Sequence, residues 1–149
     1  MNEEIEELLH RENLTLAPIT KRSTAFFIDD MLLSMLLIVA MWDSFSKATS
    51  MEDIIILTNQ VVLEYMAMKI FYQAFFTMQY GASIGKLLMK IRVIELRTLD
   101  NPNVISSLNR AIFRVVSEMF FYLGFLWGMM SPTKQTWHDK TARTIVVNA

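Results

Sequence analysis

Two adjacent aspartates interrupt an apolar stretch near the start of the chain. Residues 21–42 read KRSTAFFIDDMLLSMLLIVAMW, with Asp29 and Asp30 between hydrophobic runs. An ionisable group at the centre of a bilayer costs at least ~2.5–3.5 kcal/mol, so such groups face a protein interior, a partner charge or water. The pair therefore indicates ion pairing between helices or handling of a proton or cation.

Arginines and a glutamate in two apolar segments offer partners for these acids. Arg22 lies seven residues before Asp29, so two helical turns bring both to one helix face. Arg110, Arg114 and Glu118 are four residues apart and share a face of another helix. Glu118 is expected to pair with Arg114, which leaves Arg110 for an aspartate of the first helix.

The acids of the apolar segments admit two interpretations. A further acid, Glu64, lies in the second apolar segment, five residues before Lys69. In the first interpretation, the charges neutralise one another and lock the helices in register. In the second, Asp29, Asp30 or Glu64 takes up and releases a proton or cation in a polar cavity. The sequence leaves both interpretations open.

Composition places these residues in a membrane protein. The chain has 149 residues, of which 53% are hydrophobic and 19% charged, whereas soluble domains average about 45–50% and about 25%. The net charge of −1 gives no reason to expect nucleic-acid binding. With no cysteine and only two histidines, His10 and His138, we expect no disulfide, no metal site and no cofactor.

Three apolar segments, at about 23–42, 54–79 and 108–130, follow an acidic N-terminal segment at 1–16. Each is close to the ~20 residues that a helix needs to cross a bilayer. The third has a short charge-free run, so we expect it to enter and return with a bend at Gly124 or Gly128. Three full crossings are the alternative. The expected fold is an all-α membrane domain over residues 17–149, with two or three transmembrane helices.

Two β-branched runs outside the apolar segments, 91–96 and 143–147, are expected to pair as a short two-stranded element. Lysine and arginine are frequent in 1–22 and 80–109, and rare in the loop 43–53. By the positive-inside bias, the flanking stretches are cytoplasmic and the loop is outside. The basic tail 131–149 then places both termini in the cytoplasm, since the paired strands must share one compartment.

Two short motifs are weaker than they first look. The stretch GASIGK at 81–86 is one residue shorter than a phosphate-binding loop, and Leu87 stands where Ser or Thr would be needed. We therefore expect a turn leaving the membrane, with Lys86 on lipid head groups. His138 and Asp139 lack the nucleophile that hydrolysis would require. They are expected to form a capped turn before the final strand, and the protein is expected not to be an enzyme.

Together these residues resemble the RDD family, which is named for one arginine and two aspartates near the first membrane segment. The resemblance covers about residues 17–148, with Ser83 where Thr is commoner and Trp137 where an aliphatic residue is expected. The matching residues are Arg22, Asp29 and Asp30, then Gly81, Ser83, Gly85 and Lys86, then Arg110 and Arg114, and finally His138 and Asp139 within QTWHDKTARTIVV. The resemblance implies a bacterial inner-membrane protein, and sodium/proton exchange has been proposed for relatives.

Two functions are compatible with this reading. In the first, the protein is a transport subunit for cations or protons, with Asp29, Asp30 and Glu64 along the route. Two or three helices cannot enclose a pathway, so this function requires a homo-oligomer or a partner subunit. In the second, it is a non-enzymatic adaptor or assembly factor that docks another membrane protein. Besides such partners, only the lipid bilayer is expected to contact it.

Overall fold

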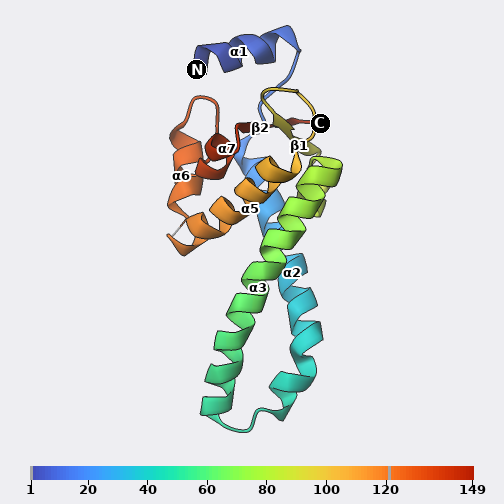
Figure 1. Cartoon of the computed structure of the whole chain (residues 1–149), viewed down its shortest axis with the longest axis vertical. Coiled ribbons are helices and arrows are strands. Elements are labelled where there is room, and N and C mark those ends of the chain that lie inside the picture. Colours follow the sequence, from blue (N-terminus) through green and yellow to red (C-terminus); the bar gives the residue numbers. More distant parts are fainter. Residues whose placement is uncertain (1, 121) are drawn as a thin grey trace.

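The computed structural model describes residues 2–120 and 122–149, and it is mostly helical with one small sheet (Figure 1). The expected fold class is confirmed. The elements in chain order are α1 (Asn2–Arg11), α2 (Ile19–Lys47), α3 (Met51–Tyr80), α4 (Ile84–Leu88), β1 (Ile91–Glu95), α5 (Val104–Met119), α6 (Leu123–Met130), α7 (Trp137–Thr141) and β2 (Thr144–Asn148).

Helices α2 and α3 form a long hairpin that projects from the rest of the molecule (Figure 1). Both are long and apolar enough to cross a membrane. The turn between them is fixed by Ser50, whose side-chain oxygen accepts a hydrogen bond from the backbone N–H of Asp53 at 3.1 Å. Large apolar side chains such as Val39 and Leu63 are exposed on the hairpin. Lipid tails are as apolar as these side chains and can surround them without cost.

The third apolar segment forms two helices, α5 and α6, with an angle of 105° between them. The predicted position of the bend is wrong, because Gly124 and Gly128 both lie within α6 rather than at the break. These glycines instead allow close packing. A Cβ on Gly124 would lie 2.2 Å from the hydroxyl oxygen of Ser117 in α5. The bent pair is either a broken span or a re-entrant loop.

Helix α5 buries its polar face and exposes its apolar face. Ser107, Arg110 and Arg114 are buried, whereas Ile105 and Ile112 are exposed. In water this arrangement would be unfavourable, because hydrophobic residues normally face the core. It suits a helix whose outer side contacts lipid and whose inner side contacts charged partners.

The strands β1 and β2 pair antiparallel, with Val93 opposite Val146. This confirms the predicted pairing of 91–96 with 143–147, apart from shifts of one residue at the strand ends. The chain before α2 joins the sheet, because Leu16 forms a bridge with Val147. The sheet thus ties the start of α2 to the C-terminal strand.

The N-terminal helix α1 covers this sheet. Its apolar residues Ile5 and Leu9 are buried against Ile94, Ile145 and Val147. The acidic residues Glu3 and Glu4 lie in its first turn and are exposed. Both chain ends lie at the sheet end of the molecule, opposite the turn between α2 and α3 (Figure 1).

Candidate functional site

Asp29 is buried where α2, α3 and α4 meet. Its carboxylate accepts hydrogen bonds from the hydroxyl of Tyr72 (2.8 Å), the hydroxyl of Ser83 (2.6 Å) and the backbone N–H of Gly85 (2.8 Å). The prediction of an arginine partner for this aspartate is wrong. Among the described residues, its hydrogen-bond donors are the neutral groups of Tyr72, Ser83 and Gly85.

The stretch Gly81–Lys86 forms the surface that binds Asp29. Gly81 ends α3 with a left-handed backbone, φ 69°, a conformation that glycine adopts at little cost. At Gly85 the backbone of α4 approaches α2 so closely that a Cβ would lie 2.2 Å from the carbonyl oxygen of Ala25. This approach lets the Gly85 N–H reach the carboxylate. The glycines therefore serve helix packing and hydrogen bonding.

Lys86 is buried, with 8% of its surface exposed, and the prediction that it lies on lipid head groups is wrong. The packing of α4 against α2 turns it inward, where it lines a cavity with Arg110 and Arg114. Burial and repulsion from these two arginines lower the pKa of the Lys86 ammonium well below its usual range. Asp29 and Asp139 counter this effect only in part.

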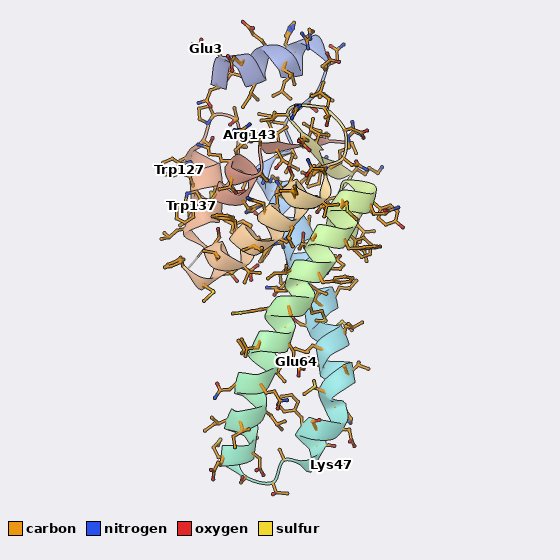
Figure 2. All side chains as sticks on the ribbon, in the orientation of Figure 1. Glu3, Lys47, Glu64, Trp127, Trp137 and Arg143 are labelled. Atoms are coloured by element: carbon orange, nitrogen blue, oxygen red, sulfur yellow. The ribbon has the colours of Figure 1, made fainter. Side chains whose placement is uncertain are left out.

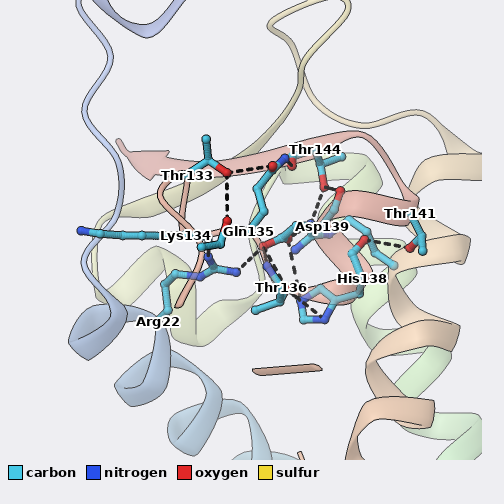
Figure 3. Close-up of polar contacts among 11 residues, drawn as sticks. Arg22, Thr133, Lys134, Gln135, Thr136, His138, Asp139, Thr141 and Thr144 are labelled. Carbon is cyan, nitrogen blue, oxygen red and sulfur yellow. Dashed lines mark hydrogen bonds and ion pairs between the residues drawn. The ribbon is translucent and has the colours of Figure 1, made fainter. Parts of the chain in front are cut away.

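Asp139 is the centre of a second cluster, formed by α2, α5 and α7 (Figure 3). Its carboxylate pairs with Arg22 at 2.5 Å and with Arg110, and it accepts a hydrogen bond from the Thr136 N–H at 3.1 Å. Burial alone would raise the pKa of Asp139, but Arg22 and Arg110 outweigh it and hold that pKa well below its usual range. Arg22 and Arg110 were predicted to pair with the aspartates of the first apolar segment. They pair instead with the closing turn.

The predicted capped turn at His138 and Asp139 is confirmed. Thr136 and Asp139 form a capping box at the start of α7, and β2 follows directly. Burial lowers the pKa of His138 well below its usual range; Asp139 opposes this, while Arg110 and Arg22 reinforce it. The imidazole is therefore neutral near neutral pH. Its contact with Asp139 at 3.8 Å is not an ion pair in that state.

A third cluster joins α2, α3 and α5. The Lys69 ammonium lies between the carboxylates of Asp30 (2.9 Å) and Glu118 (2.5 Å), and the Tyr65 hydroxyl donates to Asp30 at 3.0 Å. Glu118 also faces Arg114 at 3.7 Å, as their spacing predicts. This separation is too long for a hydrogen bond. Accordingly, Glu118 Oε1 has no hydrogen-bond partner among the described residues.

A cavity of about 10 Å³ adjoins the third cluster. Its polar lining consists of Asp29, Asp30, Lys69, Gln73, Arg114 and Glu118. The amide nitrogen of Gln73 is buried and has no hydrogen-bond partner in the described part of the chain. A cavity of this size holds roughly one water molecule, or a particle of similar size.

Glu64 lies apart from these clusters, on the part of α3 that runs toward the hairpin turn (Figure 2). It is exposed, so the structure does not bring it together with Asp29 and Asp30 as predicted. Lys69, in contrast, is a site residue that the predicted set omits. Its position within an apolar segment was the available signal, because a lysine there needs an acidic partner.

The acids of the three clusters are paired with other groups of the protein. Within residues 2–120 and 122–149, no group of three His, Asp or Glu side chains is arranged to hold a metal ion. The acids are divided among three sites, each with hydrogen-bond donors or cationic partners. Fold and site together define a small helical membrane protein with buried charges between apolar helices.

Comparison with known proteins supplies the family. The RDD family matches residues 16–143, which is most of the chain. The chain therefore belongs to the RDD family, and the expected resemblance is confirmed.

A relative of similar sequence is an uncharacterized protein of Rickettsia prowazekii (strain Madrid E). The two are 26% identical over 69 residues, which cover 46% of this chain and 38% of the relative. The match thus spans well under half of that protein's length. No solved structure is significantly similar to this chain.

Proposed function

We propose that this RDD-family membrane protein is a transport subunit that exchanges monovalent cations for protons across the bacterial inner membrane. The observation that carries the proposal is the Lys69 ammonium between the carboxylates of Asp30 and Glu118. These three residues come from three different helices. We further infer that the protein is not an enzyme, crosses the membrane more than once and keeps both termini in the cytoplasm.

The chemistry of this cluster supports exchange. Two carboxylates attract any nearby cation, so a sodium ion and the Lys69 ammonium are alternative partners for them. Oxygen atoms are the ligands that hard cations prefer. If one sodium ion enters the cluster while one proton leaves it, the net charge of the cluster is unchanged. The adjacent cavity gives the ion space, and Glu118 Oε1, which accepts no hydrogen bond from the described residues, gives it a ligand.

A homo-oligomer would complete the pathway. Two spans and a bent helix pair do not enclose a route across a bilayer. Helix α2 offers a surface for association, because Met31, Met35 and Val39 line an open apolar groove along it. Methionine adapts readily to the shape of a neighbouring helix. A second copy packed there would place α2, which carries Asp30, near a subunit boundary.

Flux through the purified protein tests the proposal. The protein is reconstituted into liposomes with a pH-sensitive dye inside, and sodium is added outside. We expect the interior to become alkaline for the wild type and for Glu64→Gln, since Glu64 lies outside the cluster. Asp30→Asn and Glu118→Gln are expected to abolish the change while remaining folded by circular dichroism. Equal flux for all four proteins would contradict the assigned centre, and no wild-type flux would contradict transport.

The groove along α2 also favours a second function, that of an adaptor or assembly factor. Its lining is apolar and continuous, as a surface for another membrane helix would be. In that case the charge clusters only lock the helices together. This function predicts stable co-purification with one membrane protein, loss of that protein when Met35→Arg disrupts the groove, and no ion flux.

A further inference from the structure

A cavity of about 220 Å³ lies where α2, α4, α5, α6 and α7 meet. Its lining has two parts of different chemistry. No acidic side chain lines it among the residues that the structure describes, and part of the lining is apolar and aromatic, including Phe125. The other part is cationic and consists of Arg22, Lys86, Arg110 and Arg114.

The protein neutralises these cations only in part. Arg22 and Arg110 share the single carboxylate of Asp139. Arg114 lies 3.7 Å from its ion-pair partner, and Lys86 has no ion pair with the described residues. Buried charges without partners are costly, so an anion in the cavity would stabilise this arrangement. The lowered pKa of Lys86 has the same origin, since it reflects burial beside two arginines.

We propose that this cavity binds the phosphate of an anionic membrane phospholipid, with an acyl chain along its apolar wall. Guanidinium groups bind phosphate oxygens through paired, charge-assisted hydrogen bonds. Basic pockets between membrane helices are suited to such head groups. The volume is below the ~300–1,000 Å³ of pockets for whole drug-sized ligands, so it fits the head-group phosphate and adjoining carbons rather than a complete lipid.

The exit from the cavity favours a lipid over free phosphate. Leu126 and Met129 of α6 line the cavity and are also exposed on the surface. A chain leaving the cavity would pass over these residues onto a surface that lipid contacts. Free phosphate would leave the apolar wall uncovered. This inference does not depend on ion exchange, because Asp30, Lys69 and Glu118 do not line this cavity. Arg114 lines both this cavity and the small one beside that cluster.

Direct binding to the purified protein tests the proposal. Native mass spectrometry from detergent micelles compares phosphatidylglycerol with phosphatidylcholine of the same acyl chains, with inorganic phosphate and oleate as further probes. We expect retention of phosphatidylglycerol in preference to the other three. Equal retention of phosphatidylcholine would overturn the proposal. Binding of inorganic phosphate alone, or of oleate but not phosphatidylglycerol, would also overturn it and indicate a different anion.

Matched variants locate the binding. Ser23 lines the cavity and is exposed, so Ser23→Asp adds a repelling charge without burying it. Its neighbour Thr24 is exposed outside the lining, and Thr24→Asp is the control. Since a charged hydrogen bond contributes enough for about a tenfold change in affinity, we expect at least that loss in Ser23→Asp and little change in Thr24→Asp. Equal losses in both variants would overturn the assigned cavity.

A second pair of variants removes a cation instead. Lys86→Gln removes the buried amine and keeps a polar side chain of similar length, and circular dichroism checks that the variant is folded. Lys90→Gln removes an exposed charge four residues further on, beyond the end of α4. We expect weaker phosphatidylglycerol binding only in Lys86→Gln. Unchanged binding in both Ser23→Asp and Lys86→Gln would show that the lipid binds elsewhere and would overturn the proposal.

Discussion

Asp139 receives Arg22 from α2 and Arg110 from α5, residues that lie far from it in sequence. Asp29, in contrast, is held by hydroxyl and backbone donors. Asp30 shares an ammonium with Glu118. The three acids therefore differ in the type of group that binds them: arginines bind Asp139, neutral donors bind Asp29, and a lysine binds Asp30. The cation of the third cluster is a single lysine ammonium on a flexible side chain, whereas the cations that bind Asp139 are planar guanidinium groups.

The first prediction concerns the charge of Asp139. Asp139→Asn should lower the free energy of unfolding by about 3–5 kcal/mol, because two buried arginines would lose their shared carboxylate. The control is Asp43→Asn, whose exposed ion pair with Lys47 should contribute at most about 1 kcal/mol. Denaturant unfolding in detergent micelles measures both. Similar effects of the two substitutions would contradict the central position of Asp139.

The second prediction is a pH dependence from the same residue. The folded-state pKa of Asp139 lies below its unfolded value of about 3.9. Its stabilising contribution is therefore fully present above about pH 4–5 and is lost as the pH falls further, through the folded-state pKa. Unfolding free energies of wild type and Asp139→Asn should differ by a constant amount near neutral pH and converge in acid. A difference that disappears near neutral pH would contradict this.

At the level of single residues, the sequence predicts which residues belong to the candidate site, but it does not predict most of the contacts between them. The sequence marks charged residues in apolar segments, because such residues need partners. It does not say which helices face one another, so Arg22 and Arg110 were matched with the wrong acids. Helical periodicity predicts only contacts between residues of the same helix. Arg114 and Glu118 are such a pair, and their predicted contact is present.

Helix α4 can pack closely against α2 because Gly85 has no side chain. The third prediction is that Gly85→Ala lowers the free energy of unfolding by about 1–3 kcal/mol, since the new methyl group would clash with the carbonyl of Ala25. The displaced N–H would also lose Asp29. Ala40→Val, on the exposed part of α2, is the control and should change stability little. An equal loss in the control would contradict the packing argument.

The ranges of the helices and strands could be predicted because they depend on local composition. Runs of apolar residues indicated α2 and α3, and β-branched runs indicated β1 and β2. The bend between α5 and α6 could not be placed. Glycine was the obvious candidate for a bend, but Gly124 is needed for contact with Ser117, and a residue's packing role is not visible before the fold is known.

For the whole molecule, the structure brings both termini to the end opposite the hairpin turn (Figure 1). The fourth prediction is that both termini face the cytoplasm and the turn faces outward. The chain has no cysteine, so single cysteines can be introduced by Ser46→Cys near the turn and Asn148→Cys near the C-terminus. A membrane-impermeant maleimide should label only the turn in cells with a permeabilised outer membrane. Labelling of Asn148→Cys from outside would contradict the topology.

Cation and proton exchange is the central claim at this scale, and coupled sodium uptake tests it most directly. The purified wild-type protein is reconstituted into liposomes, and uptake of radiolabelled sodium is followed with and without an imposed pH gradient. Exchange predicts rapid uptake when the interior is more acidic than the medium, and slow uptake when the gradient is absent or reversed. The account would be contradicted if sodium uptake did not depend on the pH gradient. It would also be contradicted if correctly folded protein took up no more sodium than empty liposomes.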